Sequence, residues 1–232
     1  MSLRLSPLLL ALIFFARILR AQSLSETEIK NLLARIAERR ASAPDVHADF
    51  QEQKTMHLMA KPIVSSGKIW FHAPNKFRRE ISGNSPSVTV SNGRDLWIHY
   101  PNFKSAEHYT LGKRSPVDAA ITAINTALNL ENVESTFRIT GTKIDLPSPG
   151  SGAAGNGYAL QLLPRSPSMK RMFQKFDLRL NSDLVAERTE MTQPNGDQIV
   201  TTYSNQTRAA IPASTFEFTP PAGTAISAPL GR

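Results

Sequence analysis

The fold is indicated most directly by two neighbouring stretches, residues 66–80 (SGKIWFHAPNKFRRE) and residues 88–101 (VTVSNGRDLWIHYP). Both are rich in aromatic and β-branched residues, which favour strands. Pro74-Asn75 and Asn92-Gly93 fall where such strands would turn, and Asn-Gly is typical of a type I′ hairpin. The stretches therefore predict a meander of strands whose apolar inner face needs either a packed core or an apolar ligand.

The same pattern continues along the chain. Residues 46–50, 158–162 and 176–180 alternate apolar and polar side chains, and Asn195-Gly196 marks a further hairpin. We expect about eleven strands with short connections, which favours an antiparallel sheet, and we expect the structured part to end at Phe218. Because a sheet of this size curls or splits, the sequence predicts a mainly β protein: an incomplete antiparallel β-barrel with helices as a lid over its open side.

Two segments carry helix signals. Residues 24–43 begin with a capping box formed by Ser25 and Glu28, and residues 115–130 begin with a Ser-Pro-x-Asp box. The first segment has one apolar stripe, made of Ile29, Leu32, Leu33 and Ile36. We expect this helix to pack on the sheet, whereas the second suits a lid as well as a packing helix.

Residues 1–21 have the composition of a signal peptide. Arg4 precedes a short apolar run that Arg17 and Arg20 interrupt, so the run is too short to span a bilayer. We expect cleavage at about Ala21, which leaves residues 22–232 as one domain; an uncleaved N-terminal anchor is the alternative. The chain has no cysteine, so it carries neither disulfides nor the thioether-linked lipid of a bacterial lipoprotein.

The chain is basic, with a formal net charge of +8. Without the three arginines of residues 1–21 the charge would be near +5 (8 minus 3). Such a balance could suit nucleic acid, an anionic membrane or an acidic partner. We expect no nucleic-acid partner, because the chain is predicted to be exported and its Lys and Arg residues are scattered.

Motifs for catalysis are weak. The sequence has no nucleophile elbow, no phosphate-binding Gly loop and no zinc-binding His-Glu helix pair, and its five His are dispersed. We therefore predict no catalytic site and no metal or proton-transfer role for these His residues. A hydrolase with a dispersed active site is the alternative.

Four segments resemble, in order, the LolA family of periplasmic outer-membrane lipoprotein carriers. They are VHADFQEQK at residues 46–54, GKIWF with Pro-Asn and Phe-Arg within 67–78, VSNG with Leu-Trp within 90–97, and FEFTPPAG at 216–223. The resemblance implies a soluble, monomeric periplasmic carrier that shields lipoprotein acyl chains under a helical lid. It also implies no covalent chemistry and no cofactor, so the protein would not be an enzyme. It implies triacylated lipoproteins as cargo, an inner-membrane ABC transporter as donor, and an outer-membrane acceptor or the outer membrane itself as destination. A LolA-like module that binds or senses a lipid or glycolipid of the envelope is the alternative.

Two positions depart from the family pattern. Ala73 stands where the family often has an Arg that tethers the lid, and its side chain has no hydrogen-bond donor. Arg79 stands where a Trp commonly follows the Phe-Arg pair. A guanidinium facing a cavity is costly unless it is paired, so Arg79 could instead meet the head group of a cargo.

Strand parity suggests which side chains line the cavity. Ile69 and Phe71 share one face of their strand, and the family's lid-tethering Arg, two residues further on, points inward. At each of these positions, the sequence is equally compatible with a side chain that packs in the core and with one that contacts a ligand. The predicted acyl-chain cavity and lid comprise Phe50, Ile69, Phe71, Phe77, Arg79, Ile81, Val88, Val90, Leu96, Ile98, Ile121, Ile124 and Leu128.

Overall fold

The computed structural model describes residues 22–112, 130, 133–147 and 154–228. Its strands form one 13-stranded sheet in the order β1-β8-β9-β10-β11-β12-β2-β3-β4-β5-β6-β7-β13. The strands are β1 (Gln22–Ser23), β2 (Asp45–Thr55), β3 (Ile63–His72), β4 (Lys76–Ser82), β5 (Ser87–Ser91), β6 (Asp95–Tyr100), β7 (Ser105–Thr110), β8 (Phe137–Pro147), β9 (Ala154–Pro164), β10 (Lys175–Leu180), β11 (Ala186–Thr192), β12 (Gln198–Thr207) and β13 (Ala225–Ser227). The helical segments are α1 (Glu26–Ser42), η1 (Pro101–Phe103), α3 (Val133–Thr136), α4 (Pro167–Lys170) and η2 (Ala213–Phe216).

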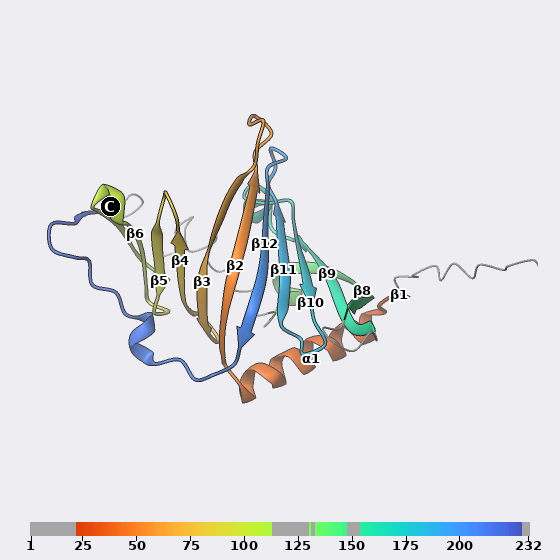
Figure 1. The fold of residues 1–232 in the computed structure, drawn as a ribbon. Coiled ribbons are helices and arrows are strands. Elements are labelled where there is room, and N and C mark those ends of the chain that lie inside the picture. The colour runs from red at the N-terminus through yellow and green to blue at the C-terminus, as the bar shows by residue number, and fades with distance from the viewer. Residues whose placement is uncertain (1–21, 113–129, 131–132, 148–153, 229–232) are drawn as a thin grey trace, which may run out of the picture.

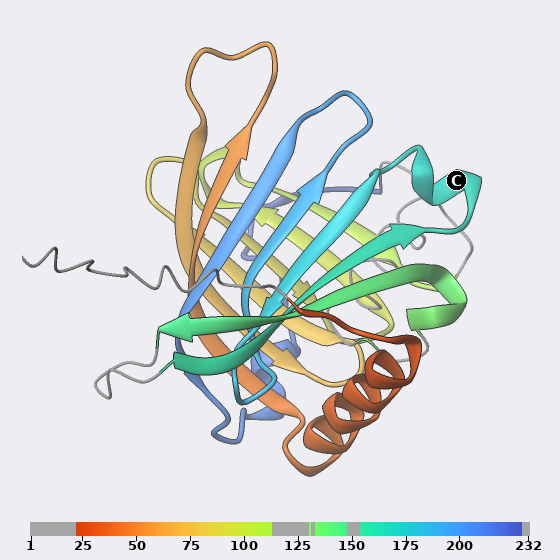
Figure 2. The same ribbon diagram turned by 90° about the vertical axis from the view of Figure 1, so that its right-hand side faces the viewer.

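The sheet is curled and open. Its two end strands, β1 and β13, pair with β8 and β7 and not with each other. In Figure 2, strands β9–β12 lie in front of strands β4–β7, and the two parts of the sheet run in different directions. The predicted incomplete barrel is thus confirmed. The sheet is antiparallel except where β13 runs parallel to β7, so the expectation that the structured part ends at Phe218 is wrong.

The helix α1 forms as the sequence predicts. Ser25 caps it: the Glu28 N–H donates to Ser25 Oγ (3.3 Å), and the Ser25 N–H donates to Glu28 Oε2 (2.9 Å). The backbone N–H of Ser25 and the ammonium of Lys143 lower the pKa of Glu28 to about 2. The helix lies along one end of the curled sheet (Figure 1).

A buried apolar cluster lies under α1 and defines what we call the inner face of the sheet. The apolar stripe of the helix, Ile29, Leu32, Leu33 and Ile36, is buried as predicted. On the sheet its partners come from β8–β10, and in the described part of the chain the cluster includes no residue of β2–β7. The sheet residues of the cluster are Phe137, Leu160, Leu162, Phe176, Leu178 and Leu180.

The opposite, outer face is crossed by the chain after β12. Phe216 in η2 is 3% exposed and its ring lies 6.1 Å from that of His72. The Phe218 ring lies 5.9 Å from Trp97 and 5.4 Å from His99. We call residues 208–228 the C-terminal strap, because they cover the outer face of β3–β6 and then extend the sheet edge as β13.

Some predicted segments lie outside the described residues. These are the signal peptide, residues 1–21, and nearly all of the second predicted helix, with Ile121, Ile124 and Leu128. They stay predictions. Among the described helices, none is long and apolar enough to cross a membrane.

Candidate functional site

The register of β2–β6 brings most of the predicted cavity residues onto one face. Residues directly opposite in an antiparallel pair share a face. Phe71 lies opposite Phe77, and Ile69 opposite Arg79. Continuing across the sheet, this face carries, of the predicted residues, Phe50, Ile69, Phe71, Phe77, Arg79, Ile81, Leu96 and Ile98. It is continuous through β12, β11 and β10 with the inner face under α1, and we call these eight residues the inner floor.

Val88 and Val90 lie on the outer face, so their prediction as cavity residues is wrong. Val88 pairs with Glu80 and Val90 with Arg78, which both point away from the inner floor. Parity carries unchanged across the turn between β4 and β5, because Ile81 pairs with Ser87 and Arg79 with Thr89. The prediction placed the two valines inside because they are apolar, but in β5 Ser87 and Thr89 lie beside the inner floor, and Val90 is buried on the outer face (1% exposed).

The inner floor is less deeply buried than the cluster under α1. Phe50 and Leu96 are each 3% exposed, whereas the other six residues are half-buried. A cavity of about 80 Å³ opens where this floor meets the end of α1. Its lining is Arg40, Pro44, Val46, Ala48, Ile69, Phe71, Leu184, Val185, Ala186, Tyr203, Gln206 and Arg208. The floor thus offers apolar surface that the described protein does not fully cover.

Arg79 is paired on this floor. Its Nη2 donates to Glu52 Oε2 at 2.7 Å, and its guanidinium carbon lies 4.4 Å from the centre of the Phe50 ring. Thr201 Oγ1 also donates to Glu52 Oε2, at 3.4 Å. The ion pair and the cation–π contact offset the cost of placing a guanidinium among apolar side chains.

Tyrosines add uncharged polar groups to the same face. Burial, followed by the hydrogen bond to Glu107, raises the pKa of Tyr109 to about 12. The Tyr109 hydroxyl donates to Glu107 Oε2 at 2.5 Å. Burial also raises the pKa of Tyr100 and of Tyr203. These hydroxyls therefore stay protonated at neutral pH and add no charge to the floor.

Sequence reasoning missed these polar members. Glu52 has the same strand parity as Phe50, which could have placed it on the inner face. Its contact with Arg79 depends on the pairing of β2 with β3 and of β3 with β4. Tyr109 and Tyr203 lie in β7 and β12. The pairing of these strands with their neighbours, which decides which face each tyrosine joins, could not be predicted from the sequence.

Ala73 lies in the turn between β3 and β4. Its backbone N–H donates to the Pro44 carbonyl oxygen at 3.0 Å, and its methyl group has no donor to offer. The Ala73–Pro74 peptide bond is cis. The segment that this position would tether in the family, residues 115–130, lies almost wholly outside the described residues.

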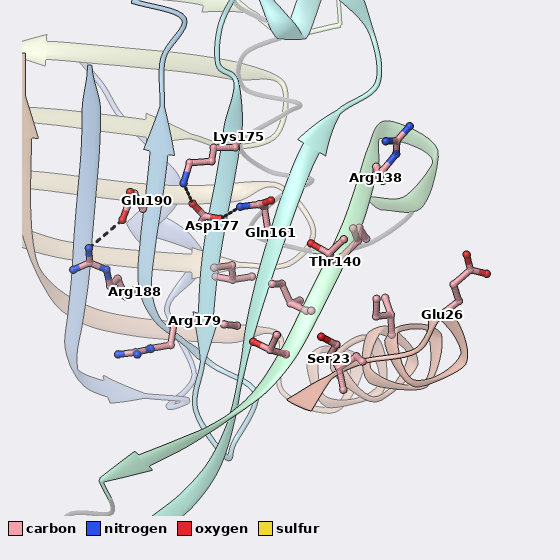
Figure 3. A pocket seen from close by; sticks show the side chains of 18 residues that line it. Ser23, Glu26, Arg138, Thr140, Gln161, Lys175, Asp177, Arg179, Arg188 and Glu190 are labelled. Carbon is pink, nitrogen blue, oxygen red and sulfur yellow. Dashed lines mark hydrogen bonds and ion pairs between the residues drawn. The ribbon is translucent and has the colours of Figure 1, made fainter. Parts of the chain in front are cut away.

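A second hollow, of about 1000 Å³, is lined largely by polar side chains of β8–β11 (Figure 3). Lys175 donates to Asp177 Oδ2 at 2.6 Å, Gln161 donates to Asp177 Oδ1 at 3.0 Å, and Arg188 donates to Glu190 at 3.1 Å. Hydrated charges of this kind do not favour an acyl chain. The apolar inner floor is therefore the better candidate site.

The histidines have structural partners. His47 stacks on Trp70 at 5.2 Å and His108 on Trp97 at 4.1 Å between ring centres. His72 Nδ1 lies 2.7 Å from Asp45 Oδ1. Within the described ranges, His, Asp and Glu side chains form no group of three or more that could hold a metal ion.

The fold and the floor define an open, curled β-sheet protein with apolar surface on its inner face. The chain belongs to the LolA family: the family model described as "Outer membrane lipoprotein carrier protein LolA" matches residues 41–219. A relative from Pectobacterium carotovorum subsp. carotovorum (strain PC1), named outer-membrane lipoprotein carrier protein, is 24% identical over 180 residues, which cover 78% of this chain and 79% of that protein. A relative of the same name from Yersinia pestis bv. Antiqua (strain Angola) is 23% identical over 225 residues, 94% of this chain and 96% of that protein. Among solved structures, a LolA superfamily protein from Nitrosomonas europaea has a TM-score of 0.42 and 14% identity, covering 82% of this chain and 97% of that one.

Proposed function

We propose that this chain is a soluble periplasmic carrier of lipoproteins, not an enzyme. It takes triacylated cargo from an inner-membrane ABC transporter and moves it to the outer membrane or to an acceptor there. The observation that carries the proposal is the half-buried inner floor, an apolar surface in a member of a family whose named relatives are lipoprotein carriers.

The floor provides the driving force for holding acyl chains. Each methylene that leaves water contributes about 0.8 kcal/mol. The cavity of about 80 Å³ beside α1 is smaller than the roughly 300–1,000 Å³ of ordinary ligand pockets. An acyl chain would therefore extend from this cavity along Phe71, Phe77 and the neighbouring floor residues. A surface that buries a chain only in part also allows its release.

The Arg79–Glu52 pair fits a carrier of hydrocarbon. Because the guanidinium already has a carboxylate within 2.7 Å, it presents no unpaired cation to a head group. The pair is neutral as a whole, and acyl chains can lie beside it. Hydrophobic contacts with Phe77 and Ile81 then dominate the binding.

The proposal is tested by native mass spectrometry of the chain with a triacylated lipoprotein and with the same lipoprotein lacking its acyl chains. We expect a one-to-one complex with the acylated form only. Ile69→Glu, on the floor, should weaken that complex at least tenfold. Ser66→Glu is the matched control, because Ser66 is exposed on the outer face of the same strand. A wild-type chain that ignores the acylated lipoprotein would refute the proposal.

A second candidate is a LolA-like module that binds or senses a lipid or glycolipid. The observation in its favour is the polar group Glu107 and Tyr109 on the inner face, which could meet hydroxyls of a head group. Such a module should co-purify with a small lipid and fail to bind the triacylated lipoprotein. The same experiment therefore separates the two candidates.

A further inference from the structure

The β2–β3 hairpin ends in an exposed apolar tip, residues 56–64. Leu58 is 85% exposed, Met59 48%, Ile63 47% and Val64 57%. Together with the neighbouring β11–β12 turn, this hairpin projects beyond the other turns at the end of the sheet opposite α1 (Figure 1). Four large apolar side chains on one projecting tip are unusual for a surface in contact only with water.

The tip is held in place by the neighbouring turn. The His57 N–H donates to Asp197 Oδ1 at 2.9 Å, and the Met59 N–H donates to the Met56 carbonyl oxygen at 2.9 Å. Asn195 Nδ2 donates to the other carboxylate oxygen of Asp197 at 3.0 Å. The apolar side chains are thus presented by a braced hairpin, so their exposure is a property of a defined structure.

The shape of the tip favours a fluid partner over a folded one. Ile63 and Val64 are consecutive strand residues, so their side chains point to opposite faces of the hairpin. A protein that packs against one face would leave the other in water. Lipid can surround the hairpin and cover both faces at once.

The charge of the tip suits anionic lipid. Residues 55–64 include Lys61 and His57 and no acidic residue. Asp197, whose side chain is only 7% exposed, lies 3.7 Å from His57 Nδ1 and accepts the hydrogen bonds described above, so Lys61 is the residue that gives the tip its positive charge. An exposed lysine beside apolar side chains can hold its ammonium at the head groups while its stem lies along the apolar region.

We propose that the β2–β3 tip inserts into the surface of a bilayer that contains anionic phospholipid, with Leu58 and Met59 in the acyl region and Lys61 at the head groups. The contact is interfacial, since the tip is far shorter than a membrane span. It does not depend on what the inner floor binds.

The absence of cysteine from the chain allows a site-specific test. Leu58→Cys and Phe103→Cys are each labelled with an environment-sensitive fluorophore. Phe103 is the matched control, because it is 79% exposed at the turn between β6 and β7. On addition of phosphatidylethanolamine–phosphatidylglycerol vesicles, we expect the emission at position 58 to shift to the blue and that at position 103 to stay unchanged. Equal responses, or none at position 58, would overturn the proposal.

Vesicle flotation of the unlabelled chain gives an independent readout. Leu58→Asp should lower binding to the same vesicles about tenfold, and Lys61→Gln roughly fivefold, whereas Phe103→Asp should leave it unchanged. Leu58 and Lys61 are exposed, so these variants should fold normally. A response at position 58 that requires membrane protein in the vesicles would also overturn the proposal and assign the tip to a protein partner.

Discussion

Arg79 shows how a charged residue is accommodated on the inner floor. Its guanidinium lies over the Phe50 ring and donates to Glu52, which also accepts from Thr201. Removing one partner of such a pair leaves the other as an unpaired, half-buried charge. Replacing both partners by apolar residues can leave the free energy of unfolding nearly unchanged. The pair should therefore behave as a unit.

We predict that Glu52→Leu lowers the free energy of unfolding by about 1–3 kcal/mol, because Arg79 is left unpaired. The double variant Glu52→Leu/Arg79→Leu should regain most of that loss and bind acylated cargo at least as tightly as the wild type. Urea unfolding and native mass spectrometry measure the two effects. A double variant less stable than the single one would contradict this account of the pair.

Gly67 is required by the close approach of β3 to β4. A Cβ on Gly67 would lie 1.8 Å from the Glu80 carbonyl oxygen and 3.0 Å from Cε1 of Phe50. We predict that Gly67→Ala destabilises the protein by about 1–3 kcal/mol, because backbone must shift. Thermal unfolding of Gly67→Ala is compared with that of Ser66→Ala, a control at an exposed position. Equal stability of the two variants would count against the prediction.

At the scale of elements, the sequence predicted local structure better than turn geometry. The capping box of α1 and its buried stripe are as expected, because both depend on residues within a few positions of each other. The Asn92-Gly93 hairpin also forms, but it is not type I′, since only Gly93 has a positive φ. Asn92 Oδ1 instead accepts hydrogen bonds from the backbone N–H groups of Arg94 and Asp95, so a side chain provides the acceptor for both donors of the turn.

The capping carboxylate gives a pH prediction. The pKa of Glu28 is lowered from 4.5 to about 2 in the folded chain. A lowered carboxyl pKa stabilises the fold above the unfolded-state pKa, and this stability is lost as the pH falls toward 2. The stability difference between wild type and Glu28→Gln should thus shrink between pH 5 and pH 2, roughly the interval between the two pKa values. A constant difference in urea unfolding across that interval would argue against the cap.

The C-terminal strap depends on Phe216. This side chain is 3% exposed, so Phe216→Ala should cost about 3–5 kcal/mol and release β13 from the sheet edge. Chemical unfolding gives the stability, and hydrogen exchange at β7 and β13 reports the release. Ile226→Ala, at a side chain that is 58% exposed, should change stability by less than about 0.5 kcal/mol. Similar losses in both variants would contradict the role of Phe216.

At the scale of the whole molecule, the open curled sheet could be predicted from strand periodicity, but its edges and registers could not. β13 has three residues and pairs in parallel with β7, so it leaves no periodic signal. The error at Val88 and Val90 has a different cause: both are apolar but face outward, and simple alternation from Ile81 would have placed Thr89 on the inner face. Hydrophobic patterning specifies that a strand has an apolar face, and pairing decides which side of the sheet that face joins.

The inner face has two parts that differ in burial. Under α1, the side chains of β8–β10 form a buried cluster that stabilises the fold. Across β3, β4 and β6, apolar side chains such as Ile69, Phe77 and Ile98 remain half-buried. In the proposed carrier, this division would let one half of the sheet stay folded while the other takes up and releases cargo.

Site-specific photo-crosslinking tests this claim most directly. A photoreactive phenylalanine analogue replaces Phe77 on the inner floor or Val88 on the outer face; both positions are half-buried and lie on paired strands. After incubation with a triacylated lipoprotein, we predict a crosslinked complex from position 77 and none from position 88. Crosslinking from position 88 alone, or equally from both, would show that acyl chains are not held on the inner floor.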